Sequence, residues 1–261
     1  MAKQRADLLL VARGLAESRA LAQRLVMAGQ VRADGQVVSK PASLLDEGAS
    51  LVVETGPRFV SRGGEKLAAA LEAFPVQVDD AVCADVGAST GGFTDCLLQS
   101  GARRVYAIDV GRGVLHWKLR NDPRVVVMER TNARHLDTLP EPVDLVVMDA
   151  SFISSAVLVP PAAGWLKSAG SLIVLVKPQF EAGRKEAARG QGVIRDAEVH
   201  EKVLLDLLPA LERNGLELRG LIRSPVTGPK GNVEFLGWFE KGAAGGIEIE
   251  QAVAKVIGEE T

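Results

Sequence analysis

Residues 82–96 read VCADVGASTGGFTDC, the pattern of a buried strand, a glycine-rich turn and the start of a helix. Gly87 and Gly91 permit backbone angles that other residues resist, and they leave no side chain between the main chain and a ligand. In open α/β sheets, ligands bind at turns of this kind, beyond the carboxyl ends of the strands. The stretch therefore predicts an α/β fold with a small-molecule site at the turn.

An acidic residue follows the next apolar run at the distance found in nucleotide-type sites. Residues 104–110 read RVYAIDV, and Asp109 lies 24 residues after Asp85. A carboxylate in this place binds ribose hydroxyls. The turn lacks the GxGxxG spacing of dinucleotide sites and the GK[ST] of triphosphate sites, which disfavours NAD and ATP. S-adenosylmethionine (SAM) fits better, because it carries a ribose but no pyrophosphate.

The same turn also matches a hydrolase motif. Residues 87–91 read GASTG, the GxSxG of α/β-hydrolases, and Ser89, Asp149 and His200 follow the chain order of that family's catalytic triad. However, Ser89 follows the first strand of its domain, whereas a hydrolase needs earlier strands and an oxyanion loop before it. We expect His200, at a predicted helix start, to face solvent. A hydrolase using Ser89 is therefore the less favoured alternative.

The composition indicates a globular protein with a basic N-terminal part. Hydrophobic residues make up 47% of the 261 positions, and the formal net charge is -2. Residues 1–40 nevertheless hold seven Lys and Arg against three Asp and Glu. A compact basic module predicts binding to nucleic acid, because paired guanidinium donors suit phosphate. The candidate RNA-binding side chains are Arg5, Arg13, Arg19, Arg24 and Lys40.

The cysteines and the apolar runs bear on metals and membranes. Cys83 and Cys96 show neither metal-ligand spacing nor a disulfide framework, so we expect core packing and no metal site. The longest apolar run, 172–176, is far shorter than the roughly 20 residues of a membrane helix. The first residues do not form a signal peptide, because Asp7 and Arg13 interrupt the apolar run. We therefore expect a cytoplasmic protein without a membrane partner, and a monomer is favoured.

Residues 1–57 are predicted to form a small α+β module. An apolar helix covers 8–13, and Ser18 is a suitable N-cap for a second helix. Residues 31–38 read VRADGQVV, a hairpin with an Asp-Gly turn. A unit of this size is too small to be an enzyme by itself, so its function is expected to be binding.

After this module, apolar runs alternate with helix-length segments, which predicts a Rossmann-like, doubly wound, mostly parallel sheet. Two later runs, 217–223 and 232–240, have no helix between them and predict a C-terminal antiparallel hairpin. The boundaries that follow are a linker at 58–63, the sheet domain at 64–242 and a tail with a short helix at 243–261. The five apolar runs are 82–86, 104–110, 124–129, 143–149 and 171–177.

Charged residues end two of the apolar runs. Asp149 ends VDLVVMD and Lys177 ends SLIVLVK, and both lie at the carboxyl end of a predicted strand, where ligands bind. Pro178 favours an extended conformation at Lys177, which keeps it aligned with the strand. Lys66 and Glu234 are unremarkable one at a time, since a helix lysine and a hairpin glutamate are usually solvated.

Six motifs containing these residues resemble one known family. RGGEKL, DVGASTGGFTD, DVGRGVLHWKLRNDPRV, MDASFIS, LVKPQFE and GPKGNVEF occur in this order. From Arg5 to Phe239 the chain resembles the TlyA family, the haemolysin A-like ribosomal RNA 2'-O-methyltransferases. The resemblance implies an S4-type RNA-binding module joined to an FtsJ-like methyltransferase domain. It also implies SAM as the cofactor and ribosomal RNA or ribosomal subunits as the partner. The older name haemolysin has no support in a sequence without a membrane-inserting segment.

The resemblance assigns roles to particular residues. It implies a catalytic tetrad of Lys66, Asp149, Lys177 and Glu234, in which Lys177 accepts the proton of a ribose hydroxyl or stabilises its oxyanion. The other three residues would position Lys177, and the methyl acceptor would be a cytidine. The cofactor-binding residues, several of which the turn already indicates, are Asp85, Gly87, Ala88, Ser89, Gly91, Phe93, Asp109 and Asn132.

Three points stay open at this stage. Base methylation is disfavoured, because the residues after the fourth strand read DASF rather than the Asn/Asp-Pro-Pro-aromatic loop of amino-group methyltransferases. A ribosomal assembly factor that binds RNA without catalysis is a further alternative. The loop at 181–192, with Arg184, Lys185 and Arg189, either closes over RNA or is simply solvated.

Overall fold

The computed structural model describes residues 2–54, 56–183, 192–228 and 230–258. The chain separates into two compact units, Met1–Arg58 and Phe59–Thr261, each with its own hydrophobic core.

The first unit packs two helices, α1 (Ala6–Ala12) and α2 (Arg19–Met27), against short strands. Ser18 caps α2 as predicted, because its hydroxyl accepts the N–H of Leu21 at 3.2 Å. Two sheets are present, one pairing β1 with β4 and one in the order β3-β2-β5. The strands are β1 (Lys3–Arg5), β2 (Val31–Ala33), β3 (Gln36–Val37), β4 (Leu44–Asp46) and β5 (Leu51–Val53).

The second unit is built on a seven-stranded sheet in the order β11-β12-β10-β9-β6-β7-β8. The pairs from β10 to β8 are all parallel, whereas β12 is antiparallel to both β10 and β11. This confirms the predicted fold class, including the C-terminal hairpin. The strands are β6 (Val82–Val86), β7 (Arg104–Ile108), β8 (Val125–Met128), β9 (Val143–Met148), β10 (Leu166–Val176), β11 (Leu216–Arg223) and β12 (Phe235–Lys241).

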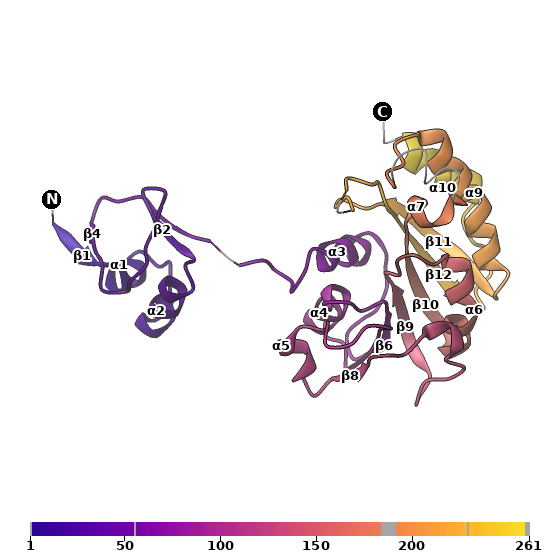
Figure 1. Ribbon diagram of the computed structural model, residues 1–261, viewed down its shortest axis with the longest axis horizontal. Coiled ribbons are helices and arrows are strands. Elements are labelled where there is room, and N and C mark those ends of the chain that lie inside the picture. Colours follow the sequence, from indigo (N-terminus) through magenta and orange to yellow (C-terminus); the bar gives the residue numbers. More distant parts are fainter. Residues whose placement is uncertain (1, 55, 184–191, 229, 259–261) are drawn as a thin grey trace. The chain divides into compact units, whose positions relative to one another are not determined.

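Helices cover both faces of this sheet (Figure 1). One face carries α3 (Gly63–Ala73), α4 (Gly92–Gln99) and the short α5 (Trp117–Arg120). The other carries α6 (Ser155–Trp165), α7 (Pro178–Glu181), α9 (Ala197–Glu212) and α10 (Ile249–Gly258). A one-turn 3-10 helix, η1 (Ala133–His135), follows β8.

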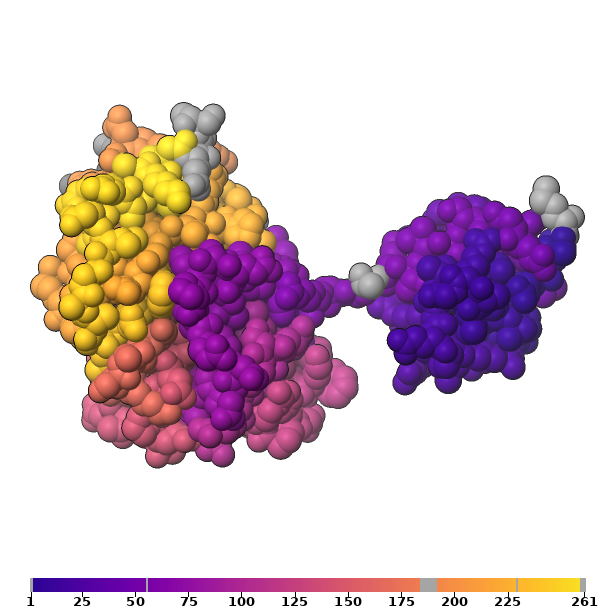
Figure 2. Space-filling model, turned by 180° about the vertical axis from the view of Figure 1, so that it is seen from behind, coloured from indigo at the N-terminus to yellow at the C-terminus, as the bar shows by residue number. Residues whose placement is uncertain are grey.

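The C-terminal helix α10 belongs to the core of the second unit. Val253 and Val256 are buried against α9 and β11, and Figure 2 shows these last residues, in yellow, packed on the orange and gold part of the chain. Among the helices that the structure describes, none combines the length and the apolar character needed to cross a membrane.

Candidate active site

The turn after β6 is held in a shape that requires glycine at position 87. Gly87 has a φ of 85°, and a Cβ there would lie 2.7 Å from the carbonyl oxygen of Asp149. At Gly91, with a φ of 97°, a Cβ would collide with the side chain of Leu119. The space that these glycines leave is therefore occupied by protein atoms. The positive φ values agree with the expectation that these positions need backbone angles that other residues resist.

Asp109, at the end of β7, fixes the turn. Its carboxylate accepts the backbone N–H of Ser89 at 2.8 Å and that of Gly111 at 2.7 Å. The N–H groups of Gly87 and Ala88 both donate to the carbonyl of Ile108, at 2.9 and 3.1 Å. Hydrogen bonds thus join the turn after β6 to the end of β7.

A cleft of about 520 Å³ lies beside this turn and the end of β7. Its polar lining includes Asp109 and Asn132, and the Asn132 side chain accepts the N–H of Arg134 at 3.1 Å. The volume lies in the range of small-molecule sites. Apolar walls with a carboxylate at one end suit an adenosine, so the residues present fit SAM. The apolar lining consists of Val86, Ile108, Val110, Ala133, Ala150, Phe152, Ile153 and Leu158.

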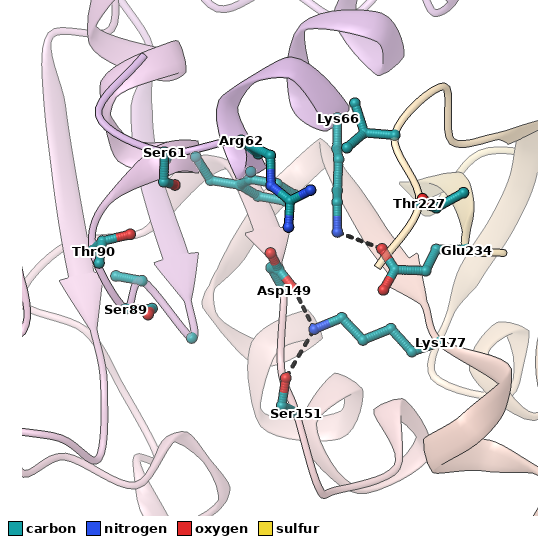
Figure 3. A pocket seen from close by; sticks show the side chains of 16 residues that line it. Ser61, Arg62, Lys66, Ser89, Thr90, Asp149, Ser151, Lys177, Thr227 and Glu234 are labelled. Carbon is teal, nitrogen blue, oxygen red and sulfur yellow. Dashed lines mark hydrogen bonds and ion pairs between the residues drawn. The ribbon is translucent and has the colours of Figure 1, made fainter. Parts of the chain in front are cut away.

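A second cavity, of about 290 Å³, contains the predicted tetrad (Figure 3). Lys66 comes from α3, Asp149 follows β9, Lys177 follows β10, and Glu234 precedes β12. Both lysines are buried, and only 2% of Glu234 is exposed. Four charged side chains that are far apart in the sequence therefore meet at the carboxyl ends of the central strands.

The tetrad forms two ion pairs. Lys66 Nζ pairs with Glu234 Oε2, and Lys177 Nζ lies 2.5 Å from Asp149 Oδ1. Lys177 also donates to Ser151 Oγ at 2.9 Å. Buried charges are tolerated when they are paired and hydrogen-bonded, so each carboxylate holds one ammonium group in a defined place.

The two cavities share one wall. Gly87, Ser89, Asp149 and Ser151 line both of them. A group bound in the cleft can therefore reach a group bound beside Lys177. This arrangement suits the transfer of a small group between two ligands.

The other predicted cofactor residues lie around these cavities. Ala88 and Phe93 line the tetrad cavity. Asp85 and Gly91 line neither cavity as the described residues define them. Asp85 is 1% exposed, and its Oδ2 accepts the hydroxyl of Thr94 at 2.6 Å. Burial raises the pKa of Asp85 to about 7, and its Oδ1 has no hydrogen-bond partner among the described residues.

Several residues that line the tetrad cavity were not predicted, and two of them carry polar side chains of particular interest. Ser151 hydrogen-bonds Lys177, and its signal is its place two residues after Asp149 in the motif MDASF. Arg62 lines the cavity, and its side chain lies beside Lys66 and Asp149 in Figure 3. Its signal in the sequence is its place at the start of the motif RGGEKL, four residues before Lys66.

The predicted RNA-binding residues fall into three groups. Arg5 and Arg19 both donate to Asp7. Arg13 donates to the backbone carbonyls of Ala49, at 2.6 Å, and Glu47, which favours a structural role. Arg24 and Lys40 are exposed. Arg184, Lys185 and Arg189 lie outside the described residues.

The expectation that His200 faces solvent is wrong. His200 is 1% exposed, because it lies on the inner side of α9. Its Nε2 is 3.2 Å from the carbonyl oxygen of Ile194, and its ring meets that of Phe235 edge to face. These contacts make His200 part of the core, which disfavours a hydrolase triad with Ser89.

The sheet topology and the matches to two family models together define the class of the protein. It is a Rossmann-like methyltransferase domain joined to a small S4 domain. Residues 59–241 match the FtsJ-like methyltransferase family, and residues 4–51 match the S4 domain. Among the described residues, no group of three or more His, Cys, Asp or Glu side chains is placed to bind a metal.

The chain belongs to the TlyA family. It is 44% identical to the 16S/23S rRNA (cytidine-2'-O)-methyltransferase TlyA of Mycobacterium tuberculosis, over 98% of either chain. It is 40% identical to Hemolysin A of Brachyspira hyodysenteriae, over 87% of this chain and 95% of the relative. A solved structure from Streptococcus thermophilus that carries the name hemolysin covers this whole chain and 96% of its own, with 41% identity and a TM-score of 0.75.

Proposed function

We propose that this protein transfers a methyl group from SAM to the ribose 2'-hydroxyl of a cytidine in ribosomal RNA. The observation that carries the proposal is the common wall of the two cavities, with the cofactor cleft on one side and the tetrad on the other. The relative of M. tuberculosis is named for this reaction. The first unit would bind the RNA, and the protein would act in the cytoplasm, where ribosomes are found.

The residues of the tetrad cavity would activate the acceptor. SAM, when bound, supplies a methyl group made electrophilic by its sulfonium. A ribose hydroxyl is a weak nucleophile, and it attacks only if its proton leaves and the two reacting atoms are in line. Lys177, oriented by Asp149 and Ser151, would accept that proton or stabilise the oxygen as it becomes negative. The Lys66–Glu234 pair would hold the other side of the acceptor.

The cleft would hold the cofactor. The Asp109 carboxylate, whose two oxygens each accept one backbone N–H, retains lone pairs for the ribose hydroxyls. Asn132 lines the cleft together with its apolar side chains, and it would contact the adenine. Asp85 is buried and lines neither cavity, so it would support the cofactor turn from within the fold through its hydrogen bond with Thr94. We propose the same domain limits as above, with the RNA-binding part at 1–57, the linker at 58–63, the methyltransferase domain at 64–242 and the tail at 243–261.

The experiment is methyl transfer with a labelled methyl group. Ribosomal subunits from a strain that lacks the gene are incubated with the protein and labelled SAM. The RNA is then digested to nucleosides, which are separated by chromatography. We expect the label in 2'-O-methylcytidine of the small-subunit RNA, the large-subunit RNA or both.

Two results would contradict the proposal. Label on a base instead of the ribose would assign the protein to base methylation. Tight binding to subunits without any transfer of label would favour the assembly-factor alternative. A matched reaction with Lys177→Ala shows whether the label depends on the tetrad.

A further inference from the structure

The first unit contains a buried carboxylate that the proposed chemistry does not use. Asp7, in the first turn of α1, has no exposed surface. Its Oδ1 accepts a hydrogen bond from Nε of Arg5 at 3.0 Å, and its Oδ2 accepts one from Nη2 of Arg5 at 2.9 Å. Oδ2 also accepts Nε of Arg19 and Nε2 of Gln23, at 3.0 and 2.9 Å. A single side chain thus joins β1, α1 and α2.

This arrangement brings two guanidinium groups together at the surface. Arg5 and Arg19 both donate to the same oxygen of Asp7, so they are neighbours. Their side chains remain 37% and 54% exposed. Their other N–H groups have no partner among the described residues and remain available to a ligand.

The charge of the cluster suits a phosphodiester. Two guanidinium groups and one carboxylate leave one net positive charge, which a single phosphodiester would neutralise. The hydrogen bonds from Arg5 hold the pKa of the Asp7 carboxyl well below its usual range, so the carboxylate stays charged. Without Asp7, the two cations would repel each other and their long side chains would be free to rotate.

We propose that Asp7 is a positioning residue that arranges Arg5 and Arg19 as a preformed site for one RNA phosphate. This inference rests on the proposed RNA-binding function of the first unit and extends it. Gln23 completes the cluster by orienting Oδ2 without adding charge. The site is built before RNA arrives, so binding does not have to order two arginine side chains.

The test uses a substitution for which charge alone and loss of positioning predict opposite effects on RNA binding. Asp7→Asn adds one net positive charge, which by electrostatics alone would tighten binding to RNA. If positioning dominates, the same variant binds more weakly, by roughly tenfold for two disordered side chains. Glu17→Gln is the matched control, because it makes the same charge change at an exposed residue of the same unit. Dissociation constants are measured by filter binding of the full chain to ribosomal subunits, without SAM.

The proposal is supported if Asp7→Asn binds more weakly than the wild type while the dissociation constant of Glu17→Gln is equal to or lower than that of the wild type. Equal or tighter binding by Asp7→Asn overturns it. If circular dichroism shows that Asp7→Asn unfolds the first unit, Arg19→Lys decides. This variant keeps the charge but loses the planar fork, so the proposal expects weaker binding and wild-type affinity would refute it. Because no methyl transfer is measured, failure here is distinguishable from failure of the proposed reaction.

Discussion

At the scale of single residues, Asp85 shows how burial changes a carboxyl group. The side chain lies at the carboxyl end of β6, and desolvation raises its pKa to about 7, with the Asp149 charge adding to the effect. In the unfolded chain an aspartate has a pKa of about 3.9. Between these two values the folded protein binds a proton that the unfolded chain releases. The free energy of unfolding must therefore fall as the pH rises through this window.

Asp85→Asn should remove this dependence, because asparagine resembles the protonated carboxyl and cannot ionise. As the pH rises from 4 to 7, the wild type should lose up to about 4 kcal/mol of stability that the variant keeps. Most of this change should be complete by pH 8. Urea unfolding of the SAM-free proteins at pH 5 and pH 8 measures the difference. A stability difference that does not change with pH would show that Asp85 ionises normally in the fold.

At the scale of elements, the turn between β6 and α4 couples the two cavities. Gly87 approaches the main chain of Asp149 at a distance that excludes a Cβ. Gly87→Ala must therefore push the turn away from Asp149, which lines both cavities. We expect at least a tenfold loss of SAM affinity by calorimetric titration, equivalent to about 1.4 kcal/mol.

Gly215→Ala is the control for backbone strain. Gly215 has a φ of 73° but no atom within 4 Å of its Cβ position. Both variants should lose about 1–2 kcal/mol of stability from the left-handed backbone, and Gly87→Ala should lose more because its Cβ meets the Asp149 carbonyl. Only Gly87→Ala should lose affinity for SAM. Equal SAM affinities in the two variants would mean that the contact with Asp149 does not hold the turn.

The elements that were predicted correctly have strong local signals. Each apolar run of the sheet contains a strand, because short runs of apolar, largely β-branched residues between turn signals are typical of strands inside a sheet. β10 starts at Leu166, five residues before the predicted run, since Lys167, Ser168 and Ala169 are exposed and carry no apolar signal. In the first unit, β1, β4 and β5 were missed. Each has three residues and forms a strand by pairing with a distant partner: β1 and β4 pair with each other from some forty positions apart, and β5 pairs with β2.

The candidate site was accessible to sequence analysis only in part. Gly87, Ser89 and Asp109 belong to one local pattern, and all three line the cavities. The Lys66–Glu234 pair spans 168 positions, and no spacing rule connects residues so far apart. The resemblance to a family named these two residues, and the fold brings them together. Their roles in catalysis stay predictions until they are tested.

At the scale of the whole molecule, the two units should unfold separately. Each has its own core, and the smaller one, of about 58 residues, should be the less stable because small domains bury less surface. All three tryptophans, Trp117, Trp165 and Trp238, lie in the second unit, so fluorescence reports that unit alone. Far-ultraviolet circular dichroism reports both.

SAM should stabilise only the second unit, because every residue of the cleft belongs to it. At a hundredfold excess over its dissociation constant, SAM should add about 2.7 kcal/mol to the transition seen by fluorescence. The earlier transition, seen only by circular dichroism, should not move. Coincident transitions in both signals, shifting together with SAM, would show that the units fold as one.

The measurement that tests the tetrad most directly is the single-turnover rate of methyl transfer by Lys177→Ala on ribosomal subunits. Lys167→Ala is the control, since Lys167 lies near the other end of β10 and pairs with Asp144 outside the two cavities. Lys177→Ala should transfer methyl groups at least about a hundredfold more slowly and bind SAM as wild type does, while Lys167→Ala keeps the wild-type rate. A wild-type rate in Lys177→Ala would contradict the assignment.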